Sequence, residues 1–315
     1  MATTTISSLS PQVNEVFLSK LLATPEGSYI HNKPADMYTL PRNSGGTVTM
    51  TRYLKLPSAL VPLGDGINPP PTTLEAVNIK VTPTFHGLFV DLTEQVTLLR
   101  NDRVLNAATM RLGQSLRQTE DELTRGVLET TASWYNCGGG TNGDNPTEIT
   151  RSDIDKVAGL LRGQDATYFE REIPGSNRFG AAPVRNAFFA LCHTDVIESL
   201  NSVSGFTNTS QYPNPYKPLP SEEGAAGNLR FLVSSLGSIT PLSSGIGGAD
   251  VYNIFCLGKN ALGVVKLDKF GTDFIYRDKK LAGGALQLSE TAGYKFSWGA
   301  RILQDLHVQN LRCTI

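Results

Sequence analysis

The residue types best suited to catalysis in this chain are a cysteine and a histidine that stand next to each other, Cys192 and His193. A thiol beside an imidazole can act as a nucleophile with its base. They end an apolar run, however, and residues 187–193 therefore predict a buried strand. Because adjacent residues of a strand point to opposite faces, the two side chains are not expected to hydrogen bond to each other. We expect no catalysis from this pair.

Two pairs of acidic residues could in principle supply a general acid and a general base. Asp153 and Asp155 open a predicted helix, where acids are favoured by the helix dipole. Glu222 and Glu223 lie in residues 203–228, which are rich in polar residues and proline and predict a long loop. We expect this second pair to be solvated, so neither pair indicates an active site.

The run GGGTNG from Gly138 to Gly143 formally fits the G-x-G-x-x-G pattern of nucleotide-binding turns. It follows a predicted helix instead of a strand, and Pro146 stands before the next helix. The run therefore predicts a flexible linker. The sequence also contains no G-x-S-x-G, no G-x-x-x-x-G-K-[ST] and no H-E-x-x-H pattern.

The metal-binding residue types are dispersed along the chain. No two cysteines lie within fifty residues of each other, which excludes a zinc knuckle or a C-x-x-C redox pair. We predict reduced thiols and neither a metal nor a cofactor; the alternative is a composite metal site assembled from distant loops. The cysteines are Cys137, Cys192, Cys256 and Cys313, and the histidines are His31, His86, His193 and His307.

The composition is that of a globular protein. The 315 residues are 40% hydrophobic and 18% charged, so a sizeable core can be buried. With 28 basic and 29 acidic residues the net charge is -1, which argues against a chain that coats nucleic acid by releasing counterions. No stretch of 18 apolar residues predicts a membrane span, and the start MATTTISSLS lacks the features of a signal peptide.

Two segments predict surfaces that one molecule cannot bury alone. Near the N-terminus, Val13, Phe17 and Leu21 share one face of a helix that Ser10 would cap. Residues 45–83 predict a β-hairpin, because apolar and polar residues alternate in both halves. Its tip, PSALVPLGDGINPPPTT, holds five prolines and two glycines, which favours a stiff arm over a floppy one. We expect both segments to become stable by lying on something else.

The rest of the chain predicts a mixed α+β core. Leucines and other apolar residues spaced by three and four predict a helix from Asn101 to Asn136, a rod of roughly 50 Å at the usual rise per residue. Thr150 is expected to cap a second helix. Tyr294 to Ile315 predicts one long strand with a bend near Gln304. Further strands are predicted at Phe85–Leu92, Leu229–Ser234 and Val251–Leu257.

This order of elements resembles the major capsid proteins of tailed bacteriophages, which share the Johnson fold, the Hong Kong-type phage coat fold. It is most similar to the branch typified by the coat protein of coliphage N-four-like podoviruses. Three strings carry the resemblance, which covers nearly the whole chain: TRYLKLPSALVPLGDGINPPPTTLEAVNIKVTPTFHGLFVDLTEQV, LCHTDVIESL and GYKFSWGARILQDLHVQNLRCTI.

The resemblance implies an α+β Johnson fold with five regions. They are an N-terminal arm (1–44), an extended loop formed by the long hairpin (45–83), a peripheral domain with its spine helix (84–149), an axial domain (150–288) and a C-terminal strand that returns to the peripheral domain (289–315). A cleaved scaffold domain before the arm is expected to be absent or supplied by a separate protein. Glycines 45–46 and 138–140 are the expected hinges between unequal neighbours.

The resemblance also implies a function and partners. The chain is expected to be a structural protein, not an enzyme, that self-assembles into the pentamers and hexamers of an icosahedral phage head in the bacterial cytoplasm. Further implied partners are portal, scaffolding and decoration proteins, and packaged double-stranded DNA contacted weakly and without sequence preference; no membrane is implied. The expected subunit contacts are Val13, Phe17, Leu21, Tyr53, Leu60, Val61, Ile67, Val77 and Ile79.

Two alternatives stay open from the sequence. One is the shell protein of an encapsulin-like nanocompartment, which would share the fold but enclose protein cargo. The other is a soluble hydrolase with a composite site. The contents of the shell separate the first alternative from a phage head, and turnover of a substrate by a monomer or small oligomer would identify the second.

Overall fold

The chain divides into two compact units. The smaller consists of Met1–Glu26, Leu88–Gln114 and Phe274–Tyr294, and the larger of Gly27–Gly87, Ser115–Asp273 and Lys295–Ile315. The computed structural model describes residues 27–41, 45–60, 62, 68–95, 104–169, 187–212, 218–241, 249–268, 272–282 and 286–315. The expected α+β class is confirmed, but the predicted N-terminal helix lies outside these residues.

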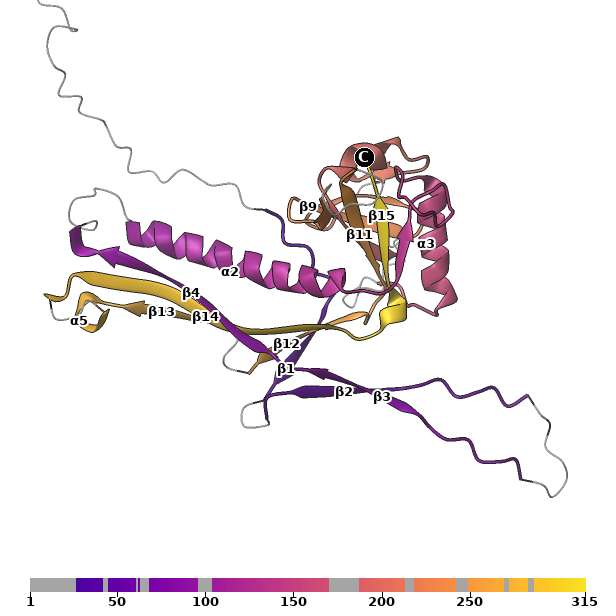
Figure 1. The fold of residues 1–315 in the computed structure, drawn as a ribbon, viewed down its shortest axis with the longest axis horizontal. Helices are drawn as coiled ribbons and strands as arrows, with labels where there is room; N and C mark the ends of the chain where they lie inside the picture. Colours follow the sequence, from indigo (N-terminus) through magenta and orange to yellow (C-terminus); the bar gives the residue numbers. More distant parts are fainter. Residues whose placement is uncertain are drawn as a thin grey trace, which may run out of the picture. The chain divides into compact units, whose positions relative to one another are not determined.

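An eight-stranded sheet forms the centre of the larger unit (Figure 1). Its order is β5-β15-β11-β6-β9-β8-β7, and β10 pairs with β11. The strands are β5 (Trp134–Asn136), β6 (Phe188–His193), β7 (Thr207–Asn208), β8 (Glu222–Ala226), β9 (Leu229–Ser234), β10 (Ile239–Thr240), β11 (Val251–Leu257) and β15 (Val308–Cys313). The three central strands are the continuous apolar runs of the sequence, as expected for strands covered on both faces.

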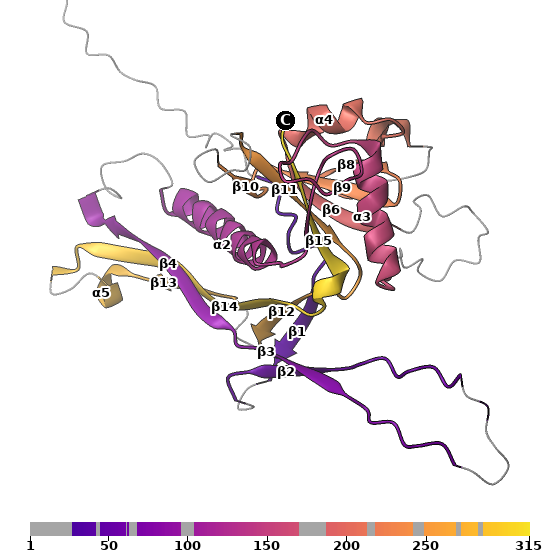
Figure 2. The same ribbon diagram turned by 45° about the vertical axis from the view of Figure 1, so that its right-hand side comes forward.

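Each face of this sheet is covered by apolar side chains of other elements. On one face lies α3 (Arg151–Gly163) (Figure 2). It packs through Ile154, Val157 and Leu161, which are fully buried. The short helix α4 (Val196–Ser202) adds to the same core. On the other face Phe255, Leu257 and Val308 contact Leu128 from the last turn of α2. The two faces give the larger unit two layers of core.

The first turn of α3 explains why the glycine run beside it is fixed. Thr150 and Asp153 form a capping box, as predicted for the cap. The Asp153 carboxylate also accepts hydrogen bonds from the backbone of Gly138 (3.1 Å) and Gly140 (2.7 Å). Gly140 has a φ of +92°, where a side chain would be strained. The predicted flexible linker is therefore wrong: its amides form an anion-binding nest that holds the protein's own carboxylate.

The predicted loop at residues 203–228 is wrong in part, because it contains strands. β8 pairs antiparallel with β9, and this places Glu222 beside Arg230. Glu222 is only 6% exposed and accepts a 2.8 Å hydrogen bond from Arg230 Nε, a 3.0 Å bond from the Tyr212 hydroxyl and a 2.8 Å bond from the Leu219 amide. The expectation of a solvated Glu222 is thus wrong as well, since the side chain of Arg230 on the next strand reaches it diagonally.

The long helix is shorter than predicted. α2 spans Val104–Glu129, which is 26 residues or roughly 39 Å at the usual rise per residue. The amides of Thr130 and Thr131 bond to carbonyls three residues earlier, which closes the last turn. Residues 134–136 then pair in parallel with β15. Trp134 fits the helical spacing but belongs to a strand, and the expected cap Asn101 lies outside the described residues.

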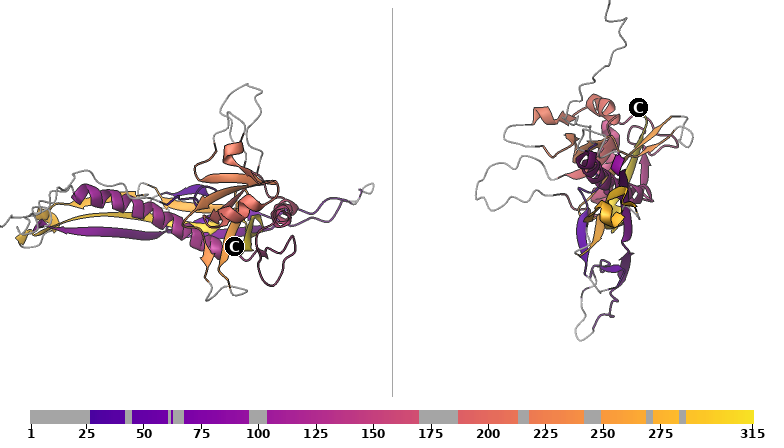
Figure 3. Two further views of the ribbon diagram at one scale, coloured as in Figure 1. Left: turned by 90° about the horizontal axis from the view of Figure 1, so that it is seen from above. Right: turned by 90° about the vertical axis from the view of Figure 1, so that its left-hand side faces the viewer.

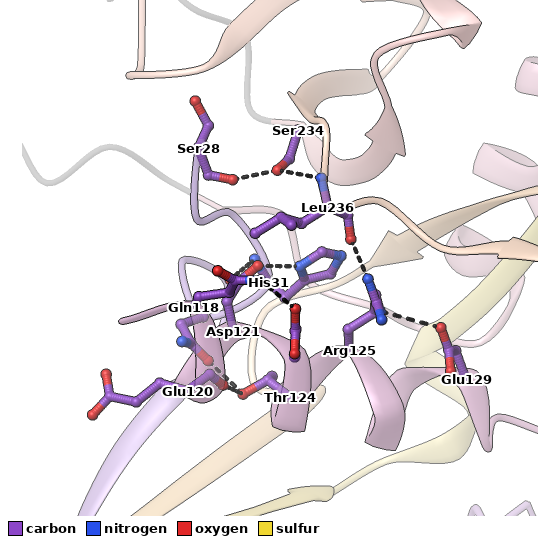
Figure 4. A network of polar contacts seen from close by, with 12 residues as sticks. Ser28, His31, Gln118, Glu120, Asp121, Thr124, Arg125, Glu129, Ser234 and Leu236 are labelled. Atoms are coloured by element: carbon purple, nitrogen blue, oxygen red, sulfur yellow. Dashed lines mark hydrogen bonds and ion pairs between the residues drawn. The ribbon is translucent and has the colours of Figure 1, made fainter. Parts of the chain in front are cut away.

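A network of hydrogen bonds fastens the start of the described chain to α2 (Figure 4). The backbone amide of His31 donates to Asp121 (2.8 Å), and His31 Nδ1 lies 2.6 Å from the same carboxylate; both residues are buried. The Ser28 carbonyl accepts a bond from the Ser234 hydroxyl of β9. Residues 28–31 therefore connect the helix to the eight-stranded sheet within the larger unit.

The C-terminal segment forms two strands in place of the one bent strand that was predicted. β14 spans Ser289–Ile302, and its last residues pair antiparallel with β12 (Leu262–Leu267), which pairs in parallel with β1 (Asp36–Leu40). A 3-10 turn at Asp305–His307 follows, and β15 enters the eight-stranded sheet. The apparent bend is thus a change of sheet. Apolar and polar residues alternate in both strands, so the sequence gives no sign that the chain passes from one sheet to another.

The smaller unit is built from a β-sheet and the first turns of α2. Within it the start of β14 pairs with β13 (Thr272–Arg277) and with β4 (Thr84–Thr93) (Figure 3). The Glu94 amide donates to the Leu288 carbonyl (2.7 Å), and the Tyr276 hydroxyl donates to Glu290 (2.7 Å). A short helix, α5 (Lys279–Ala282), places Lys279 Nζ 3.2 Å from Glu94.

Candidate functional site

The most prominent candidate site is the predicted hairpin of the larger unit. β2 (Val48–Tyr53) and β3 (Ala76–Val81) pair antiparallel, with Val48 opposite Val81 and Tyr53 opposite Ala76. The Thr51 hydroxyl donates to the Asn78 side chain across the strands (2.8 Å). Alternation of side chains predicted this pairing from the sequence, and the structure confirms it.

The base of the hairpin is fixed to the larger unit by a small apolar core. Val81, Leu40 of β1 and Val265 of β12 are buried against one another, and Val48 and Met50 pack on them. Isolated two-stranded hairpins are marginally stable, so this core is what gives β2 and β3 a definite conformation. Among the described residues, this apolar core involves the end of the hairpin far from its tip.

Beyond this base, the described hairpin residues are exposed. This holds for every residue of 53–60 and 68–78, and for residue 62. Several large apolar side chains lie among them: Tyr53 (64% exposed), Leu54 (40%), Leu56 (53%), Leu60 (87%), Leu74 (59%) and Val77 (38%). One ion pair, Lys55 with Asp165 at 3.5 Å, links this part to the rest of the unit. Both of its side chains are exposed, so it contributes little.

The predicted contact residues therefore divide into three groups. Tyr53, Leu60 and Val77 are exposed, as a surface for another subunit requires. Ile79 is half-buried and lines a groove of the larger unit. Val13, Phe17, Leu21, Val61 and Ile67 lie outside the described residues. Contact with a neighbour stays a prediction for all of them.

The groove beside the hairpin base has a volume of about 800 Å³. Ile79 and Lys80 line it from the hairpin, Val127 and Thr130 from the end of α2, and Arg301 from the end of β14. Arg52 reaches across it, with Nη1 3.4 Å from the Leu303 carbonyl. The groove therefore lies between the hairpin, the end of α2 and the end of β14, and the Arg52 side chain links the hairpin to residue Leu303.

The smaller unit carries exposed apolar side chains that the sequence reasoning missed. Leu88 and Phe89 of β4, Phe274 and Tyr276 of β13, and Leu288 before β14 are between 44% and 70% exposed. Exposed large apolar side chains are candidates for contact with another molecule. The signal was present in FHGLFVDL, where apolar residues occur on both faces of the predicted strand.

The chemical candidates are not assembled into a catalytic arrangement. Cys192 is buried and its thiol donates to the Leu232 carbonyl (3.5 Å), whereas the His193 ring bonds to the Ser235 carbonyl (3.1 Å). The two therefore have separate partners, as predicted from their opposite faces. Among the residues that the structure describes, no three His, Cys, Asp or Glu side chains gather as metal ligands. Within the same residues no helix is long and apolar enough to cross a membrane.

A family model described as "Phage capsid protein" matches residues 78–278, which is more than half of the chain. The chain belongs to the phage capsid protein family. The match covers most of the second hairpin strand, all of α2 and most of the eight-stranded sheet. No curated protein sequence matches the chain.

Solved phage capsids share the fold over nearly the full length. The capsid of Ralstonia phage GP4 matches with a TM-score of 0.72 at 14% identity, covering 99% of this chain and 98% of that one. The capsid of Cyanophage Pam1 matches with a TM-score of 0.67 at 13% identity, covering 99% and 98%. The capsid of Cyanophage P-SCSP1u matches with a TM-score of 0.65 at 11% identity, covering 99% and 95%. The predicted Hong Kong-type fold is confirmed.

The protein is thus a major capsid protein of a tailed bacteriophage, a structural protein of the icosahedral head and not an enzyme. As such it assembles with copies of itself into a shell. The family decides against the hydrolase and favours a phage head over a nanocompartment. The narrower prediction of the N-four-like podovirus branch stays a prediction.

Proposed function

We propose that the hairpin of this capsid protein lies on a neighbouring subunit within the pentamers and hexamers of the head. The observation that carries this proposal is the exposure of Tyr53, Leu56 and Leu60 on an arm whose described apolar anchor lies at its base. A large apolar side chain contributes about 1.5–3 kcal/mol when it is fully buried, before the entropic cost of association. Several such residues on one arm supply a substantial part of a typical interface.

The remaining regions have proposed places in the shell. The segment with α2 and the smaller unit would form the peripheral domain, and most of residues 150–288 the axial domain around the five-fold and six-fold axes. β15 pairs with β11 and β5, so residues 308–313 would belong with the axial domain, whereas β14 would stay with the peripheral domain. Of the two expected hinges, only Gly45–Gly46 is kept, because Asp153 holds Gly138 and Gly140.

The contents and partners of the shell follow from the same family and from the charge. We propose that the head encloses double-stranded DNA, contacted weakly and without sequence preference because the net charge of the chain is -1. Assembly would occur in the bacterial cytoplasm, where the four free cysteines stay reduced. Portal, scaffolding and decoration proteins are the further proposed partners.

Assembly of hairpin variants tests the proposal. The triple variant Tyr53→Ser, Leu56→Ser, Leu60→Ser removes exposed apolar groups without touching the hairpin core, and Leu160→Ser on α3 is the matched control with an exposed leucine elsewhere. We expect wild-type protein and the control to form rings or shells in negative-stain images, and the triple variant to remain monomeric with an unchanged circular dichroism spectrum. Shells of the triple variant in wild-type yield would contradict the proposal.

A further inference from the structure

The four cysteines, far apart in the sequence, meet in one core of the larger unit. Their strands are consecutive in the sheet, in the order β5, β15, β11, β6. All four side chains are fully buried in the same apolar cluster. Spacings of more than fifty residues concealed this convergence. The set comprises Cys137 directly after β5, Cys313 at the end of β15, Cys256 in β11 and Cys192 in β6.

Two of these cysteines are neighbours in a parallel ladder. The register of β5 and β15 pairs Tyr135 with Leu311 and Asn136 with Arg312, and the Cys137 amide donates to the Arg312 carbonyl (2.8 Å). Cys137 and Cys313 continue this register by one step and enter the same core. Adjacent strands lie about 4.8 Å apart, which is within the range of about 4.4–6.8 Å between the Cα atoms of a disulfide. The Cys313 thiol donates to the Tyr252 carbonyl (3.8 Å).

The other two cysteines have no cysteine opposite them. Cys256 stands opposite Gln309 on one side and Ala190 on the other. Cys192 stands opposite Val233. The register therefore singles out one pair and supplies two equally buried cysteines as internal controls.

Oxidation of the pair requires access, and the end of β15 provides it. Beyond Cys313, two described hydrogen bonds hold Thr314: its amide donates to the Thr147 carbonyl (3.1 Å) and its hydroxyl to the Pro146 carbonyl (3.4 Å). Ile315 is 50% exposed. A strand end held by few hydrogen bonds opens locally at a lower free-energy cost than the core. Brief opening of the end of β15 would expose the Cys313 thiol while leaving Cys137 in place.

We propose that Cys137 and Cys313 form a disulfide when the folded protein meets a hydroperoxide. Cys313 attacks the peroxide: its thiol and hydrogen peroxide give a sulfenic acid and one water. After β15 closes, the Cys137 thiol attacks that sulfur, the S–S bond forms and a second water leaves. The two thiols lose two electrons in total, and the peroxide gains them. The bond would tie the last strand to the end of β5 across 176 residues of chain, from 137 to 313.

The environment of Cys137 sets the order of events. The neighbouring Cys313 side chain and burial both raise the pKa of the Cys137 thiol, so it is a poor first nucleophile. Burial raises the pKa of Cys256 to about 12 and that of Cys192 well above its ordinary value, which protects the two controls. In a reducing cell the two cysteines stay as thiols. Oxidation would occur after the particle is released into oxidising surroundings. The inference does not depend on how subunits contact one another.

Thiol counting on the folded full-length chain tests the inference. The protein is purified with reductant, transferred to buffer without it and treated with hydrogen peroxide. It is then denatured in the presence of an alkylating reagent, which blocks the remaining thiols. We expect free thiols to fall from four to two per chain, a non-reduced digest to contain the Cys137 peptide linked to the Cys313 peptide, and dithiothreitol to restore four. The variants Cys192→Ser and Cys256→Ser should form the same link.

Three results would overturn the inference. They are retention of four thiols after treatment, links that involve Cys192 or Cys256, and oxidation of Cys313 to a sulfinic acid with no link formed. The variant Cys313→Ser should retain Cys137 as a thiol under peroxide. If this variant fails to fold, the peptide map of the wild-type chain decides alone.

Discussion

Replacing one of two adjacent acids, Glu222→Gln, tests the buried ion pair of the larger unit. The Glu222 side chain is fully buried and that of Arg230 is 11% exposed. Besides two bonds from Arg230, Glu222 accepts bonds from the Tyr212 hydroxyl and the Leu219 amide. A glutamine of the same shape has one acceptor oxygen and no charge, which leaves Arg230 without its counter-ion.

The expected loss follows from this geometry. Removing one partner of a buried pair costs about 3–5 kcal/mol, because the other charge stays buried and uncompensated. The matched control is Glu223→Gln. Glu223 is half-buried, and its carboxylate accepts one bond from the Asn208 amide (3.0 Å). We expect a loss of about 1 kcal/mol or less for this control.

Urea unfolding, monitored by circular dichroism, measures the loss of unfolding free energy in both variants. We expect the urea midpoint of Glu222→Gln to lie well below that of the wild type. The midpoint of Glu223→Gln should stay close to the wild-type value. The double variant Glu222→Gln, Arg230→Met should recover part of the loss, since Arg230→Met removes the orphaned charge. Equal midpoints for the two single variants would show that Glu222 is solvated, and the description of β8 would then be wrong.

Four further substitutions test local geometry. Burial lowers the pKa of His307, so its neutral form is favoured by folding; stability should fall as pH drops below about 6.5, and His307→Asn should reduce this fall in urea titrations at pH 7.5 and 5. Gly126→Ala, whose new methyl meets nothing within 4 Å, should stabilise α2 by about 1 kcal/mol, whereas Gly293→Ala places a methyl 2.7 Å from Phe89 Cβ and should lower the melting temperature. Thr150→Ala removes the cap of α3 and should cost about 1 kcal/mol in urea unfolding; an unchanged midpoint would refute the cap.

The sequence was most informative where a pattern has a single physical meaning. Alternation in residues 48–53 and 76–81 predicts a hairpin because successive side chains of a strand point to opposite faces. Thr150 predicts a cap because its hydroxyl oxygen can accept a hydrogen bond from a backbone amide of the first turn. The exposure of Tyr53 and Leu60 was predictable in the same way, since no local partner was in reach.

The errors arose where tertiary pairing overrides a local pattern. Trp134 continues the helical spacing but is a strand residue, because β15 supplies a ladder for it. Glu222 is polar but buried, because Arg230 stands on the next strand. The change of sheet near Asp305 cannot be predicted from alternation, which both sheets share. The meeting of Cys137 with Cys313 depends on register between strands that are far apart in the sequence.

The central claim is that the hairpin is stabilised by another copy of the chain. A cryo-electron microscopy reconstruction of assembled particles tests it most directly. The account predicts that Tyr53, Leu60 and Val77, which are exposed within one chain, are covered by a neighbouring subunit in the particle. A reconstruction in which residues 53–60 and 68–78 lie against their own chain, or project into solvent without contacting another subunit, would contradict it.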